Sequence, residues 1–284
     1  MPGQLTQVAF MDTTRYETVN GHKIAYHREG TGVPLILIHG ITTYSFIWRK
    51  LFPSLAEHND VIALDLLGCG DSDKPADVDY SISAQADMIK LFMDQLGVER
   101  CHLVCHDIGG GIGQILATRY QERTHTLTLV NSIGYDYWPV QPISTMRIPF
   151  FRQIGMAVLD AGFLEVLIKR GLYHKERCTD DLMNNYYRPL RTPEGRRGFL
   201  RLAKCLDNGD LMSIVDDLQN LSIPVLIIRG DEDVYLKPDI AERLHREIKT
   251  SRLERIETGG HFIQEDEPEW LVGLIKDFAM KHGV

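Results

Sequence analysis

The chain has 284 residues, of which 44% are hydrophobic and 25% charged, and its formal net charge is -8. This composition is ordinary for a globular protein, and the length suits one α/β domain that carries an insertion. The negative charge argues against nucleic acid or an anionic membrane as the main partner, because both bind basic surfaces.

The start of the chain and its cysteines indicate the compartment. Residues 1–7 are too polar for a secretory signal, and no apolar run approaches the roughly 20 residues that span a membrane. The five cysteines are odd in number, and no set of cysteines and histidines has the spacing of metal ligands. We therefore expect a cytoplasmic protein without a metal or a cofactor.

The first predicted elements are a hairpin and two buried strands. Asn20-Gly21, between the short runs 16–19 and 23–28, is a strong hairpin signal. The runs 34–38 and 61–65 are continuously apolar, which is typical of parallel strands that helices cover on both faces.

Strands and helices then alternate along the chain. An amphipathic helix is predicted over 81–96, where apolar residues recur at steps of four and three, and Gly97 suits its C-terminal cap. The alternation predicts a mostly parallel sheet flanked by helices. The remaining strands are expected over 102–105, 126–130, 225–228 and 252–256, and the remaining helices over 109–120, 241–248 and 270–282.

Between Asp136 and Leu218 the alternation stops. The segments 148–172, 180–187 and 196–207 have helical patterns, and no run resembles a strand. We expect an all-helical insertion over 136–218 in a core made of 1–135 and 219–284. An insertion at this place lies over the carboxyl edge of the strands, where ligands bind in such sheets, so a cap is favoured over an appendage without a role in binding.

The segment HLVCHDIGGG, residues 102–111, predicts a buried strand that runs into a glycine-lined turn and opens a helix. In one large fold family such a turn carries the nucleophile, usually as G-x-S-x-G. Asp107 stands at that position here, and a carboxylate can attack a saturated carbon to form an alkyl ester. The N-terminus of the helix favours its ionised form. The plain alternative is an aspartate that only caps the helix.

Further motifs lie before and after this turn. His39-Gly40 ends an early apolar run, Gly230-Asp231-Glu232-Asp233 follows a late one, and His261 lies in a Gly-Gly-His loop after the last predicted strand. The order of nucleophile, acid and histidine is that of the α/β-hydrolases, and the chain resembles that superfamily. The segment DLLGCGDSDKP, residues 65–75, is similar to the corresponding loop of haloalkane dehalogenases and epoxide hydrolases, the branch with an aspartate nucleophile.

The resemblance implies an α/β-hydrolase fold with a helical cap, a small-molecule substrate and a catalytic triad. Asp107 would be the nucleophile, and His261 would be the general base that activates water against the ester. Asp233 is expected to orient the histidine, with Asp231 as an alternative and Asp136 as a weaker third.

The oxyanion hole is expected from the backbone N–H groups of Ile41 and Ile108. Their side chains depart from the family, because haloalkane dehalogenases carry Trp after the nucleophile and commonly a polar residue after His-Gly. Neither isoleucine can donate a hydrogen bond to a halide, which counts against a dehalogenase. Tyrosines of the insertion could instead protonate an epoxide oxygen; the candidates are Tyr173, Tyr186 and Tyr187.

Three functions therefore stay open. Hydrolysis of an epoxide on a small, mostly apolar substrate is the preferred prediction, and dehalogenation of a haloalkane is the second. The third is a protein of this fold that binds a small molecule or catalyses a non-hydrolytic step, in which Asp107 is not a nucleophile.

Overall fold

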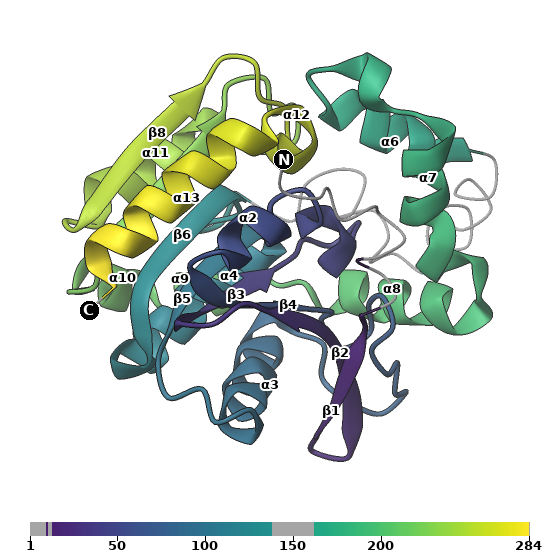
Figure 1. Cartoon of the computed structure of the whole chain (residues 1–284), viewed down its shortest axis with the longest axis horizontal. Helices are drawn as coiled ribbons and strands as arrows, with labels where there is room; N and C mark the ends of the chain where they lie inside the picture. The colour runs from purple at the N-terminus through teal and green to yellow at the C-terminus, as the bar shows by residue number, and fades with distance from the viewer. Residues whose placement is uncertain (1–9, 11–12, 138–161, 284) are drawn as a thin grey trace.

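The computed structural model describes residue 10, residues 13–137 and residues 162–283. Its centre is an eight-stranded sheet in the order β1-β2-β4-β3-β5-β6-β7-β8 (Figure 1). The pairs β1-β2 and β2-β4 are antiparallel and all other pairs are parallel, so the predicted mostly parallel sheet is confirmed. The strands are β1 Arg15–Val19, β2 His22–Glu29, β3 Val33–Ile38, β4 Asn59–Leu64, β5 Cys101–Asp107, β6 Thr124–Ser132, β7 Val225–Gly230 and β8 Ser251–Ile256.

The predicted hairpin joins β1 and β2. Val19 pairs with His22, so Asn20 and Gly21 form a two-residue turn, and their φ angles are 49° and 80°. Positive φ at both central residues is what a type I′ turn requires, and asparagine and glycine adopt it at the least cost. The hairpin prediction is confirmed.

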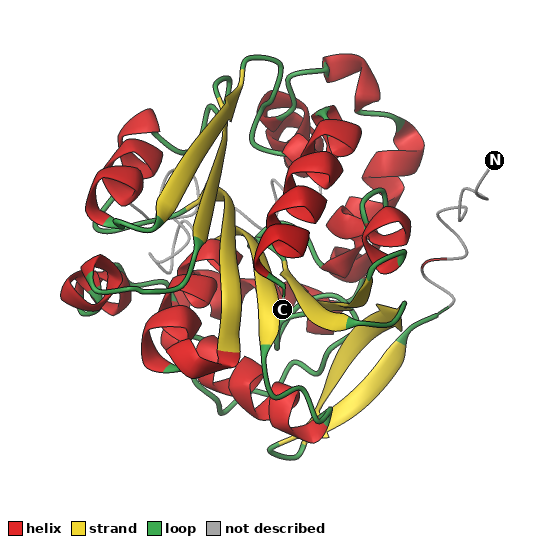
Figure 2. Ribbon diagram, turned by 60° about the vertical axis from the view of Figure 1, so that its left-hand side comes forward, coloured by secondary structure: helices red, strands yellow, loops and turns green. Residues whose placement is uncertain are grey.

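Helices cover both faces of the sheet (Figure 2). The predicted helix over 81–96 is α3, in which Ser81 accepts a hydrogen bond from the backbone N–H of Ala84 and Gly97 follows the last turn at a φ of 68°. The helical segments of the core are η1 Ser45–Trp48, α2 Phe52–Ala56, α3 Ile82–Gln95, α4 Ile108–Arg119, η2 Gln121–Arg123, α11 Pro238–Glu247, α12 Ile263–Asp266 and α13 Pro268–His282.

The regular elements that the structure describes between β6 and β7 are helices, in line with the prediction. The helix expected over 180–187 is α7 with these bounds, whereas the one expected from 196 begins earlier, because Thr192 caps it and Pro193 occupies its first turn. Residues 148–161 of the helix expected over 148–172 lie outside the described residues. The described helices here are α6 Leu164–Gly171, η5 Lys175–Arg177, α7 Asp180–Tyr187, η6 Arg188–Arg191, α8 Pro193–Cys205, α9 Gly209–Met212 and α10 Val215–Gln219.

Polar contacts of Arg188 and Tyr44 hold this helical segment against the core. Arg188 of η6 makes two hydrogen bonds to the carboxylate of Asp71, at 3.0 and 2.8 Å, and its guanidinium lies 4.9 Å from the centre of the Tyr44 ring. The Tyr44 hydroxyl donates to the backbone oxygen of Asn185 at 3.2 Å. Paired Arg–carboxylate bonds fix orientation as well as distance, so α7 and η6 are held over the loop that contains Asp71.

Candidate active site

Asp107 lies at the end of β5 and caps α4 in a strained conformation. Its φ and ψ are 54° and -120°, a region that non-glycine residues rarely adopt. The next two glycines let α4 approach its neighbours: a Cβ on Gly109 would lie 2.6 Å from the Ile38 oxygen, and one on Gly110 would lie 2.0 Å from the Ser132 hydroxyl. Strain of this kind is typical of functional turns, and here it presents a carboxylate at the carboxyl edge of the sheet.

The Asp107 carboxylate is buried and accepts backbone hydrogen bonds. The N–H of Ile41 donates to its Oδ1 at 3.0 Å, and the N–H of Ile108 also stabilises its ionised form. Burial nevertheless raises the pKa of Asp107 above its ordinary value, against the opposing effects of His261 and these two N–H groups. The predicted lowering of the Asp107 pKa by the helix N-terminus is therefore smaller than the increase caused by removing the carboxylate from water.

His261 is paired with Asp233. Its Nδ1 lies 3.0 Å from Asp233 Oδ2, and the other carboxylate oxygen accepts backbone N–H groups from Tyr235 and Leu236 at 2.8 and 3.1 Å. Burial lowers the pKa of His261, but the carboxylates of Asp233 and Asp107 outweigh it and raise that pKa above its ordinary value. Burial raises the pKa of Asp233, but His261 and the two N–H groups outweigh it and lower that pKa.

The structure separates the three acids that the sequence left open. Asp231 hydrogen-bonds Arg255 at 2.7 Å on the surface, and Asp136 is exposed after β6. Asp233 is the acid that contacts His261. On its other side, His261 Nε2 lies 3.9 Å from Asp107 Oδ2, which is too far for a direct hydrogen bond but places the imidazole beside the carboxylate.

Asn131 is a site residue that the sequence reading missed. It is the penultimate residue of β6, with a φ of 39°, and its side-chain N–H groups donate to the backbone oxygens of Gly260 and His261 at 2.8 and 3.0 Å. Its side-chain oxygen accepts the N–H of Gly230 at 3.0 Å. Asn131 thereby joins the end of β7, which leads to Asp233, to the loop of His261. A polar residue at the carboxyl end of a predicted strand was the available signal.

His106 also supports the histidine loop from β5. Its Nε2 lies 3.0 Å from the backbone oxygen of His261, and the two imidazole centres are 4.9 Å apart. Burial lowers the pKa of His106 to about 3, so its ring is neutral near pH 7 and can donate this hydrogen bond.

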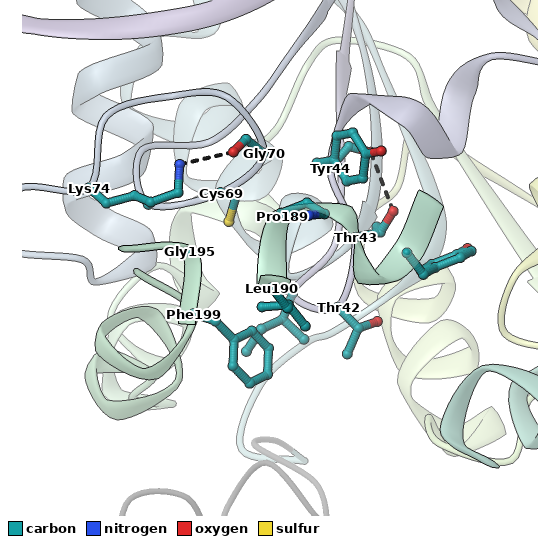
Figure 3. Close-up of a pocket in the computed structure, with 13 residues that line it drawn as sticks. Thr42, Thr43, Tyr44, Cys69, Gly70, Lys74, Pro189, Leu190, Gly195 and Phe199 are labelled. Atoms are coloured by element: carbon teal, nitrogen blue, oxygen red, sulfur yellow. Dashed lines mark hydrogen bonds between the residues drawn. The ribbon is translucent and has the colours of Figure 1, made fainter. Parts of the chain in front are cut away.

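A pocket adjoins Ile41, between the loops of the core and the helical segment (Figure 3). Thr42 and Cys69 contribute to its core side, and Leu190 and Phe199 to the opposite side. Ile41 links the pocket to the candidate nucleophile, because its N–H binds Asp107, although Asp107 and His261 are not among the lining residues. The lining is mixed but largely apolar around one charged side chain, Lys74, whose ammonium is held by the backbone oxygens of Gly70 and Ser72.

Of the three tyrosines singled out in the sequence, Tyr186 lines this pocket. It is 2% exposed, and its hydroxyl lies beside Thr43 without a well-formed hydrogen bond to any described residue. Its ring packs edge-on against that of Phe262, the neighbour of His261, with the two ring centres 5.9 Å apart. Tyr173 is 40% exposed and Tyr187 is half-buried, and neither belongs to the described lining.

Two other expectations concern what the chain lacks. Among residues 10, 13–137 and 162–283, no three His, Cys, Asp or Glu side chains are grouped in a way that could hold a metal ion. Over the same residues, none of the helices has the length and hydropathy needed to cross a membrane.

The chain is similar to known proteins over most of its length. A family model described as alpha/beta hydrolase fold matches residues 33–268. Haloalkane dehalogenase 2 of Mycobacterium tuberculosis is 30% identical over 262 residues, which cover 89% of this chain and 90% of that protein. The cis-3-alkyl-4-alkyloxetan-2-one decarboxylase of Shewanella oneidensis is 28% identical over 272 residues, which cover 91% and 86%.

A solved structure with the same architecture is that of a putative ancestral haloalkane dehalogenase. It superposes with a TM-score of 0.82 at 29% identity, over 94% of this chain and 98% of that one. The overall fold is therefore shared across nearly the full length of both chains.

The contact between Asp233 and His261 predicts the titration of the histidine. In Asp233→Asn the imidazolium loses its main stabilising charge while its burial remains, so the pKa of His261 should fall below that of the wild type. Nitrogen-15 NMR titration of the imidazole measures this directly. Asp231→Asn is the matched control, since Asp231 binds Arg255 on the surface, and it should leave the titration unchanged. An equal shift in both variants would contradict the assignment of Asp233.

Proposed function

The chain belongs to the α/β-hydrolase fold family, and from this membership and the site geometry we propose that it is a hydrolase that forms a covalent ester on Asp107. One observation carries the proposal. Asp107 binds the N–H of Ile41 through one oxygen and faces His261 with the other, while the far nitrogen of His261 binds Asp233. This arrangement holds a nucleophile, a base and an orienting acid in sequence.

The first step is alkylation of Asp107. Its Oδ2, which the N–H of Ile41 does not occupy, attacks a saturated carbon of the substrate. A carbon–oxygen bond forms to Asp107 as the bond from that carbon to the leaving atom breaks and its electron pair moves to the leaving atom. Asp107 needs no base in this step, because the ionised carboxylate is already a nucleophile.

The second step is hydrolysis of the ester. Loss of the negative charge of Asp107 in the first step prepares His261 for it. Ester formation neutralises Asp107, which removes one of the two carboxylates that raise the pKa of His261. The pKa of His261 falls as a result, so more of its imidazole is neutral, and the neutral ring takes a proton from water as the water oxygen attacks the ester carbonyl carbon. The N–H groups of Ile41 and Ile108 stabilise the resulting oxyanion. Its collapse breaks the bond from the acyl carbon to the product oxygen, and the proton on His261 passes to that oxygen. Asp107, left as the acid, then loses the remaining proton of the added water to the donor that gave up its proton in the first step, or to solvent, and the carboxylate is restored.

We propose an epoxide as the substrate, with Tyr186 as the acid that protonates the opening oxygen. The support is the position of Tyr186: it lines the pocket beside Ile41, and its buried hydroxyl is not engaged in a well-formed hydrogen bond to the described chain. The pKa of Tyr186 is raised by burial, so the phenol retains its proton near neutral pH. Neither Ile41 nor Ile108 offers a side-chain donor to a halide.

Dehalogenation of a haloalkane is the second candidate. The 30% identity with haloalkane dehalogenase 2 of Mycobacterium tuberculosis favours it, because that relative covers most of this chain. In either reaction we assign residues 136–218 the role of a cap on a core of 1–135 and 219–284. The cap would exclude water from the pocket and shape it for a small, mostly apolar substrate.

Oxygen transfer tests the covalent route. In a single turnover of an epoxide in water enriched in oxygen-18, the product should carry ordinary oxygen from Asp107, and the enzyme should gain the label. Later turnovers should release labelled product. Mass spectrometry of product and protein measures both. Asp107→Asn is the control and should not convert the epoxide in a single turnover. Oxygen-18 in the product of the first turnover would contradict an ester on Asp107.

Substitution of the tyrosines tests the leaving-group chemistry. Tyr186→Phe should slow epoxide opening by about 10²–10⁴-fold, because one general acid is lost. Rapid-mixing measurements of the alkylation phase give this rate. Tyr173→Phe and Tyr187→Phe are matched controls that should behave as the wild type, because neither tyrosine lines the pocket. Better turnover of bromoalkanes than of epoxides of similar size, with Tyr186→Phe unimpaired, would replace epoxide hydrolysis by dehalogenation.

A further inference from the structure

Asp266 is a buried carboxylate outside the proposed triad, at the end of α12. Its side chain is fully shielded, and both of its oxygens accept backbone hydrogen bonds. The N–H groups of Gly260 and Tyr173 donate to Oδ2 at 2.9 Å each, and that of His174 donates to Oδ1 at 3.0 Å. Within the described chain, no lysine, arginine or histidine side chain forms an ion pair with it. Three peptide N–H groups therefore replace the water that this carboxylate has lost.

These donors come from two segments far apart in the sequence. Gly260 directly precedes His261, whereas Tyr173 and His174 follow α6 in the helical segment after β6. One side chain thus joins the histidine loop to the helical segment. A second bond closes the same junction, because the backbone N–H of His261 donates to the oxygen of Gly171 at 2.7 Å.

The histidine loop and the turn after α6 are packed so closely that neither can shift against the other. A Cβ on Gly260 would lie 2.3 Å from the oxygen of Gly171, and a Cβ on Gly171 would lie 2.6 Å from the ring of Phe262. Arg177 of η5 adds a further contact, since it donates to the backbone oxygens of Glu265 and Asp266. The loop of His261 is therefore seated on the turn after α6 by backbone contacts on several sides.

We propose that Asp266 is a positioning residue that fixes the loop of His261 to the helical segment, so that the imidazole is held beside Asp107 only while that segment is in place. The role of His261 as a base rests on the proposed function. The seating of its loop rests on observed contacts that do not depend on that function: the hydrogen bonds to Asp266 and the bond from the N–H of His261 to the oxygen of Gly171. Loss of the carboxylate leaves the N–H groups of Gly260, Tyr173 and His174 without a full set of acceptors, and the loop is then free to shift.

The test compares Asp266→Asn with Glu265→Gln. Glu265 is the adjacent residue and is also buried, but its carboxylate binds Arg49, at 2.5 and 2.9 Å, and Lys50, at 2.8 Å, in the core. Both variants remove one buried negative charge from α12, so they match in the change of net charge. Only Asp266→Asn removes a carboxylate that both the histidine loop and the helical segment bind.

The first readouts need no substrate. In Asp266→Asn, amide hydrogen exchange at Tyr173 and His174 should become faster, and the pKa of His261 should fall because its contact with Asp233 loosens. The charged groups that face His261 are Asp233, Asp107 and Arg229, and both variants leave them intact. Glu265→Gln should lower the melting temperature yet keep exchange and titration near the wild type. The same exchange and titration in both variants would overturn the proposal.

The second readout is turnover of an epoxide. Asp266→Asn should lower kcat by about 10²-fold, because a misplacement of the base near 1 Å costs a factor of that size. KM should fall as well, because the ester accumulates when its hydrolysis limits turnover. Glu265→Gln should retain kcat. Absence of turnover by the wild type would refute the proposed function, while exchange and titration would still decide the positioning role.

Gly260→Ala provides an independent variant if Asp266→Asn does not fold. Its Cβ would collide with the oxygen of Gly171 and displace the histidine loop without touching the carboxylate. It should show the same faster exchange at Tyr173 and His174 and the same fall in the pKa of His261. Wild-type exchange and titration in Gly260→Ala would overturn the proposal.

Discussion

The burial of three ionisable groups in one small volume is the constraint on which the site depends. Asp107, Asp233 and His261 are each less than a tenth exposed. Isolated charges in such a place cost several kcal/mol each, so the fold must provide their partners. Peptide N–H groups provide most of them: Ile41 binds Asp107, while Tyr235 and Leu236 bind Asp233. His261 lies between the two carboxylates and compensates part of both charges.

This balance also bears on the two steps of the proposed mechanism. The free carboxylate of Asp107 raises the pKa of His261, and an ester at the same position does not. In that mechanism the imidazole is therefore more often neutral, and able to accept a proton from water, after alkylation than before it. The same balance requires that His261 stay in position, and this is where the polar side chains around its loop matter. Asn131 binds the oxygens of Gly260 and His261, and Asp266 binds the N–H of Gly260.

Much of the fold could be predicted because its signals are local. Asn20-Gly21 specifies a hairpin turn, Ser81 and Gly97 bound α3, and continuous apolar runs mark the parallel strands. The turn at Asp107 was also visible, since the strand, the aspartate and the glycines are contiguous. A helical insertion was expected between the predicted strands 126–130 and 225–228, and the regular elements described there are helices.

The rest depends on contacts between distant segments. Asp231 and Asp233 follow the same strand, and only the packing of β8 decides that Arg255 takes the first and His261 the second. Asn131 and Asp266 act on backbone groups far along the chain, which no local pattern reveals. The rise in the pKa of Asp107 reflects how completely its surroundings exclude water, which the helix N-terminus alone did not predict.

The most direct measurement of the central claim is the intact mass of His261→Phe after incubation with an epoxide. The variant keeps the nucleophile but lacks the base, so the ester should accumulate. The protein mass should rise by that of one substrate, and the adduct should map to a peptide that contains Asp107. The double variant with Asp107→Asn should stay unmodified. An unmodified His261→Phe protein that still binds the epoxide would contradict an ester on Asp107.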